Sequence, residues 1–74
     1  MKEIKELFNK IGKSDIDESM TNLLSDGIID SMDIMALVVE IEKLYKKPLK
    51  SKFIINENFE SFESICKMLN EAMQ

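Results

Sequence analysis

The sequence predicts an all-α protein, a small four-helix bundle of three main helices and one short helix with a long first loop. Three separate segments place apolar residues three and four positions apart, the spacing that lines one face of an α-helix. The two glycines and the single proline lie between these segments. With 74 residues, 45% of them hydrophobic, the chain suits one small domain spanning residues 1–74.

The first helix is predicted from an apolar stripe of Ile4, Leu7, Phe8 and Ile11. Lysine and glutamate occupy its other faces, and Gly12 stands where a glycine commonly ends a helix. We therefore expect a short amphipathic helix that ends close to this glycine.

A long loop is predicted to follow, because residues 13–30 mix polar and apolar side chains without a helical period. Long loops in small domains are frequently functional. Six apolar residues are expected to anchor this one to the core: Ile16, Met20, Leu23, Leu24, Ile28 and Ile29.

The second helix should begin near Ser31, because Asp30 or Ser31 can cap it and Asp33 places negative charge in its first turn. It should end before Pro48, since the residue before a proline disfavours helical geometry. Its predicted apolar stripe is Ile34, Val38, Ile41 and Tyr45, widened by Leu37 and Leu44.

The last helix is predicted from about Glu60 to Met73. Its apolar side holds Phe62, Ile65, Cys66, Leu69 and Met73, and we expect Cys66 to be a small buried hydrophobic residue. Residues 49–59 give a mixed signal, in which Phe53-Ile54-Ile55 fits a short helix, an extended piece or a loop equally well.

The composition excludes several classes of function. The chain has no histidine, one cysteine, and ten lysines without any arginine, and its net charge is −4. Histidine-based nucleophile systems, zinc clusters and intrachain disulfides are therefore excluded, and no metal site is expected. Met20 occupies the position where a calcium loop spanning residues 15–26 needs glycine. An acidic chain without arginine is also a poor nucleic-acid binder. Because these classes of site are excluded, we expect a protein that is not an enzyme.

Neither a membrane span nor a secretory signal is expected. No segment has the roughly 18–20 consecutive apolar residues of a span, and residues 1–6 are charged rather than apolar. Together with the lack of paired cysteines, this predicts a cytoplasmic protein, which we expect to be a monomer.

Charges are sorted along the chain. Residues 14–42 carry eight acidic residues and no lysine, whereas residues 43–52 carry five lysines and no acidic residue. The acidic block is consistent with a solvated face, and also with a docking surface for basic partners.

Ser31 lies between Asp30 and Asp33 at the predicted start of the second helix. The commonest role of a serine there is to cap the helix. Autonomous nucleophilic catalysis is not expected, because the chain has no histidine or third-group relay to activate the hydroxyl. The remaining possibility is that another enzyme modifies Ser31, since a phosphate ester would face the free N–H groups of the helix start.

Asp30-Ser31-Met32 resembles the Asp-Ser-Leu motif of acyl carrier and peptidyl carrier proteins, whose serine receives 4′-phosphopantetheine from coenzyme A. The likeness covers nearly the whole chain. It includes the approach Gly27-Ile28-Ile29, the helix from Ile34 to Tyr45, and Asn58-Phe59-Glu60-Ser61-Phe62 near the last helix. It implies a carrier that holds acyl or aminoacyl groups as thioesters on a 4′-phosphopantetheine arm attached to Ser31 and delivers them to partner enzymes in trans.

The resemblance also implies partners with basic docking surfaces: a phosphopantetheinyl transferase, and acyl- or aminoacyl-loading and transfer enzymes. Asp30 and Asp33 would help dock the transferase, and Glu40 and Glu42 would extend the acidic face. The transferase would supply the magnesium and the general base.

Three departures from the family pattern narrow the type of carrier. Met32 replaces the usual leucine, Ala36 replaces a frequent glutamate, and lysines replace a more acidic stretch over residues 43–52. They favour an aminoacyl, D-alanyl or specialised biosynthetic carrier over the carrier of fatty-acid synthesis. The competing function is an acidic helical interaction module that is never modified.

Three apolar residues of the second helix have two possible roles. Met32, Met35 and Val39 form a stripe beside the predicted core face, next to Ser31. Exposed, this stripe would suit docking to several partners, because methionine adapts to irregular surfaces. Met35 and Val39 fit the core equally well.

Overall fold

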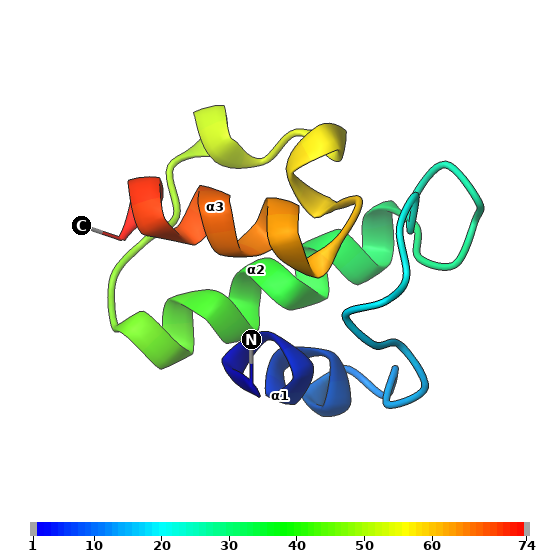
Figure 1. Ribbon diagram of the computed structural model, residues 1–74. Helices are drawn as coiled ribbons and strands as arrows, with labels where there is room; N and C mark the ends of the chain where they lie inside the picture. Colours follow the sequence, from blue (N-terminus) through cyan, green and yellow to red (C-terminus); the bar gives the residue numbers. More distant parts are fainter. Residues whose placement is uncertain (1, 74) are drawn as a thin grey trace.

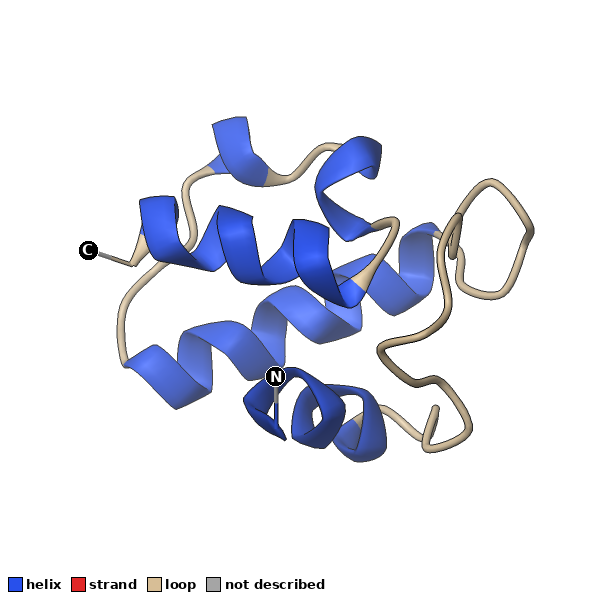
Figure 2. Ribbon diagram, in the orientation of Figure 1, coloured by secondary structure: helices blue, strands red, loops and turns tan. Residues whose placement is uncertain are grey.

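The computed structural model describes residues 2–73, and these contain three α-helices and no strand. The helices are α1 (Lys2–Lys10), α2 (Ser31–Tyr45) and α3 (Phe62–Ala72), with two short 3₁₀-helices, η1 (Ser51–Phe53) and η2 (Asn56–Phe59), between α2 and α3. α1 lies against both α2 and α3, as can be followed in Figure 1, and Figure 2 shows the long irregular connection between α1 and α2. The predicted all-α class is confirmed.

α1 ends at Lys10, one residue earlier than its apolar stripe suggested, and the turn that terminates it contains the expected glycine, Gly12. The N–H of Lys13 donates to the carbonyl of Phe8 at 2.9 Å, and that of Gly12 donates to Asn9 at 3.1 Å. This pair of bonds requires a left-handed residue, which Gly12 provides with a φ of 81°. Ile11 lies in the turn, half-buried against the core.

α2 begins and ends where its sequence signals predicted. Asp30 is the N-cap, and the left-handed Lys46, with a φ of 57°, is the C-cap two residues before Pro48. Ile34, Leu37, Val38 and Ile41 form the buried face. Leu44, which was predicted to widen that face, is 43% exposed and does not belong to it.

The segment before α3 differs from the prediction. Glu60 and Ser61 precede α3 rather than belonging to it, because the Ser61 hydroxyl accepts a hydrogen bond from the N–H of Ser64 and caps the helix. Phe53 ends η1, while Ile54 and Ile55 are irregular. Polar residues spaced through residues 49–59 favour single turns, which explains the mixed sequence signal.

The core joins all three helices to the two connections. Phe8 of α1 and Phe62 of α3 stack with ring centroids 5.2 Å apart and an interplanar angle of 3°. Cys66 is half-buried at the margin of this core, rather than fully buried as expected. Among residues 2–73, the sixteen buried side chains are Ile4, Leu7, Phe8, Ile16, Leu23, Ile29, Ile34, Leu37, Val38, Ile41, Leu49, Phe59, Phe62, Ile65, Met68 and Leu69.

The long first connection is held in place at several points. Ile16, Leu23 and Ile29 are buried, and Met20, Leu24 and Ile28 pack against the core, as predicted. The ammonium of Lys5 in α1 donates to the backbone carbonyls of Ser14 and Ile16, the latter at 2.6 Å. These anchors fix the path of the chain toward the start of α2. Within residues 2–73, no helix is long and apolar enough to cross a membrane.

Candidate functional site

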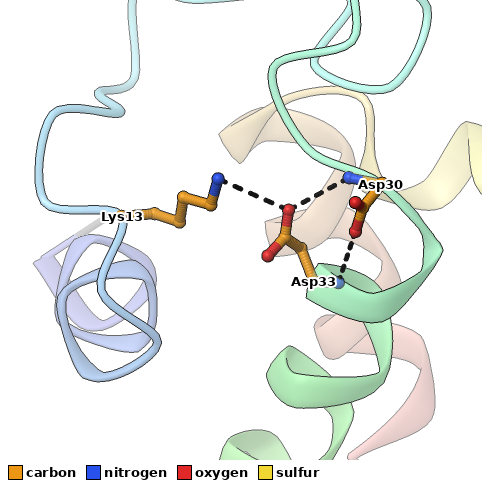
Figure 3. Close-up of polar contacts among 3 residues, drawn as sticks. All are labelled: Lys13, Asp30 and Asp33. Atoms are coloured by element: carbon orange, nitrogen blue, oxygen red, sulfur yellow. Dashed lines mark hydrogen bonds and ion pairs between the residues drawn. The ribbon is translucent and has the colours of Figure 1, made fainter.

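The first turn of α2 is closed by two aspartates, and Ser31 lies between them. The Asp30 carboxylate accepts from the N–H of Asp33 at 3.0 Å, and the Asp33 carboxylate accepts from the N–H of Asp30 at 3.1 Å. This reciprocal pair is a capping box, shown in Figure 3. The capping role that the sequence allowed for either Asp30 or Ser31 therefore belongs to Asp30.

Ser31 is the first residue of the helix, and its side chain is exposed. Across residues 2–73, no hydrogen bond involves the Ser31 hydroxyl. The backbone N–H groups of Ser31 and Met32 also have no hydrogen-bond partner within those residues. The hydroxyl thus stands in solvent at the positive end of a 15-residue helix, without a structural task.

Lys13 reaches across from the end of α1 to the same turn. Its ammonium lies 3.6 Å from the carboxylate of Asp33, as Figure 3 shows. Part of the charge of Asp33 is thereby balanced within the protein, and Asp33 itself is only partly exposed. The Asp33 carboxylate, predicted to dock a partner, also has a structural role. Sequence reasoning missed Lys13, because nothing in its local pattern pairs it with a residue twenty positions away.

Replacing Asp30 by alanine is expected to lower the free energy of unfolding by about 1 kcal/mol, because the N–H of Asp33 loses its acceptor. Urea denaturation followed by circular dichroism measures the loss. Asp30→Asn should recover most of it, since an amide oxygen also caps. Asp26→Ala is the matched control, because its exposed side chain makes no capping bond. An equal loss in Asp26→Ala would contradict the assignment of the cap.

Glu60 holds the chain that leads to Ser31. Its carboxylate accepts from the N–H groups of Leu24 and Ser25 at 2.8 and 3.1 Å, and from the hydroxyl of Ser25 at 2.6 Å. Its backbone carbonyl accepts from the N–H of Leu23 at 2.9 Å. These bonds span 35 to 37 positions of sequence, so local patterns gave no sign of them. Glu60 ties the approach to Ser31 to the start of α3.

The hydrogen bonds from Ser25, first from its hydroxyl and then from its N–H, lower the pKa of Glu60 below its usual value of 4.5. A lowered folded-state pKa stabilises the protein above pH 4.5, and this contribution is lost as the pH falls through the folded-state pKa. The free energy of unfolding of wild type should therefore exceed that of Glu60→Gln at pH 7. The difference between the two free energies should shrink below pH 4.5. Urea denaturation from pH 7 to pH 3 measures this. A constant difference would contradict it.

An exposed apolar stripe follows Ser31 along α2. The side chain of Met32 is 78% exposed, that of Met35 55% and that of Val39 48%. The alternative that Met35 and Val39 belong to the core is therefore wrong. The buried residues of α2 lie on the opposite side of the helix, so the stripe faces solvent.

The two glutamates predicted to extend the docking face are partly exposed and already engaged. Glu40 lies 3.6 Å from the ammonium of Lys43, and Glu42 accepts from the N–H of Leu49 at 2.9 Å. Glu42 therefore helps to shape the connection after α2. Within the described part of the chain, no three metal-ligating side chains come together. The site thus consists of an exposed hydroxyl, two flanking carboxylates and an apolar stripe.

Comparisons of this chain with protein-family models, with curated proteins and with solved structures found no match.

Proposed function

We propose that this protein is a carrier that receives 4′-phosphopantetheine on Ser31 and presents an acyl or aminoacyl group to partner enzymes in the cytosol. The observation that supports it most directly is the exposed Ser31 hydroxyl at the head of α2, which no hydrogen bond occupies within residues 2–73. The simplest structural explanation for a serine at this place was a helix cap, and Asp30 performs that role instead.

The surroundings of Ser31 fit a phosphodiester. The unpaired N–H groups of the first turn and the positive end of the helix dipole favour a negative group there. The ammonium of Lys13, 3.6 Å from Asp33, offsets the repulsion that the flanking carboxylates would exert on it. When bound, the phosphopantetheine group supplies a thiol at this site, where the chain has no cysteine.

Attachment is a phosphoryl transfer in which Ser31 acts as the acceptor. The Ser31 oxygen forms a bond to the phosphorus that carries the pantetheine, the hydroxyl proton passes to a base of the transferase, and adenosine 3′,5′-bisphosphate leaves. As the resemblance to carrier proteins implies, we assign the base and the magnesium to the transferase.

Intact mass measurement tests this proposal. The protein is incubated with coenzyme A, magnesium and a phosphopantetheinyl transferase of broad specificity, and the product is digested for peptide mapping. We expect a gain of one phosphopantetheine, located on the peptide that contains Ser31. A folded protein that gains no mass would overturn the proposal in favour of the unmodified acidic interaction module.

We further propose that η1 and η2 together take the place of the short helix in the four-helix bundle that the resemblance implies. They occupy the interval between α2 and α3, and Phe59 at the end of η2 is fully buried. The departures at Met32, at Ala36 and in the lysine-rich segment support an aminoacyl, D-alanyl or specialised cargo rather than that of fatty-acid synthesis.

The apolar stripe of Met32, Met35 and Val39 is assigned to docking of the transferase and later enzymes. Met35→Gln combined with Val39→Thr should lower kcat/KM for loading by about tenfold, because a partner would then bury polar groups. Stability should change by less than about 0.5 kcal/mol, since both side chains are exposed. Leu44→Gln is the matched control, on the same helix and 43% exposed. Equal loading by all variants would contradict the assignment.

A further inference from the structure

The lysine-rich segment, residues 43–52, lies at the opposite end of α2 from Ser31. All five of its lysines are exposed: Lys43, Lys46, Lys47, Lys50 and Lys52. In Figure 1 the connection after α2 crosses one edge of the molecule, and the loop that leads to Ser31 occupies the other edge. The proposed carrier function makes no use of this basic end.

Three of these lysines surround a shallow groove. Lys47, Lys50 and Lys52 line it together with Pro48, Phe53 and Ala72, and Glu71 is its one acidic lining residue. The ammonium of Lys52 lies 5.2 Å from the centre of the Phe53 ring. Lys43 is paired with Glu40. Within residues 2–73, no carboxylate forms an ion pair with Lys46, Lys50 or Lys52, so their charges are available to a partner.

Exposed apolar side chains flank the lysines. Leu44 is 43% exposed in the last turn of α2, and Ile55 is 44% exposed just after η1. Pro48 is also exposed, at the rim of the groove. A surface with lysines around exposed aliphatic groups matches the boundary of a bilayer, where ammonium groups meet lipid phosphates and short apolar side chains reach the acyl region.

The type of cation favours a diffuse negative surface over a defined acidic peptide. The chain contains no arginine, so it lacks the planar fork that recognises a carboxylate through two parallel hydrogen bonds. Lysines act as point charges, and clusters of four to eight are typical of segments that bind anionic lipids. We propose that residues 43–52 dock this protein on an anionic membrane surface.

This orientation leaves Ser31 accessible. α2 has 15 residues, which corresponds to roughly 22 Å from its basic end to Ser31. The net charge of −4 and the acidic residues before α2 repel an anionic membrane, so the basic end alone faces it. The proposal goes beyond the carrier function and does not require that Ser31 be modified.

Co-sedimentation with vesicles tests the docking. The probes are vesicles of phosphatidylcholine with 40% phosphatidylglycerol, and vesicles of phosphatidylcholine alone, at low and high salt. We expect binding only to the anionic vesicles, and loss of that binding in high salt. The test variant is Lys46→Gln/Lys50→Gln/Lys52→Gln, which should weaken partitioning by about a hundredfold, or roughly fivefold per lysine.

The control variant is Lys2→Gln/Lys10→Gln/Lys67→Gln, which makes the same change in net charge outside the segment. It should bind anionic vesicles nearly as well as wild type, and both triple variants should keep the circular dichroism spectrum of wild type. Equal losses in the two variants, or no binding by wild type at low salt, would overturn the proposal. The proposal would also be overturned if wild type self-associated, or bound polyglutamate, without binding to the vesicles. Using the unloaded Ser31→Ala protein throughout keeps this result separate from the carrier proposal.

Discussion

Ser31→Ala is expected to abolish phosphopantetheine loading completely and to leave the stability of the protein unchanged within about 0.5 kcal/mol. Loading disappears because the variant has no oxygen to accept the phosphoryl group. Stability is retained because Asp30, not Ser31, caps α2, and the Ser31 side chain is exposed. Intact mass after incubation with transferase and coenzyme A measures the first effect, and urea denaturation measures the second.

Two variants make the Ser31 result specific. Ser14→Ala removes another exposed hydroxyl and should load like wild type. Ser31→Thr keeps a hydroxyl but adds a methyl group to the carbon that bears it, which crowds the reacting oxygen, so it should load much more slowly. Loading of Ser31→Ala at any rate, or loss of loading in Ser14→Ala, would show that the attachment site is elsewhere. A loss of stability larger than that of Asp30→Ala would instead return the capping role to Ser31.

Phe62→Ala is expected to lower the free energy of unfolding by about 3–5 kcal/mol. Phe62 is 1% exposed and stacks on Phe8, so its removal leaves a cavity at the contact between α1 and α3. A domain of this size has a total stability of roughly 4–11 kcal/mol, and the variant will be close to unfolding at room temperature. Phe62→Leu fills part of the space and should lose less. Urea denaturation followed by circular dichroism ranks the variants.

Phe53→Ala is the matched control for the core. Phe53 is only half-buried at the end of η1, and its ring contacts Lys52 rather than another aromatic ring. We expect a loss of less than about 2 kcal/mol. If Phe53→Ala were as destabilising as Phe62→Ala, the stacked pair would not be the centre of the core.

The helices were predictable because their signals are local. Ile4, Leu7 and Phe8 repeat at helical spacing, and the left-handed Gly12 ends α1 as its position suggested. Pro48 likewise set the end of α2. The prediction was least accurate over residues 49–61, because single turns of 3₁₀-helix are too short to show a periodic pattern. Glu60 was also predicted inside α3, which begins two residues later.

The candidate site likewise has features that local sequence predicts and features that depend on the fold. The sequence by itself marked Ser31, its flanking aspartates and the acidic block, because a helix start and a run of charge are properties of neighbouring residues. The choice of Asp30 over Ser31 as the cap was settled by a bond within the first turn of α2. Only the tertiary structure decided that Met35 and Val39 face solvent and that Lys13 and Glu60 support the site. Helix packing determines which side of α2 leaves its apolar stripe uncovered. The bonds that join residues twenty or more positions apart likewise depend on how the chain folds back on itself. That path is set by burial of the whole core, and no local pattern encodes it.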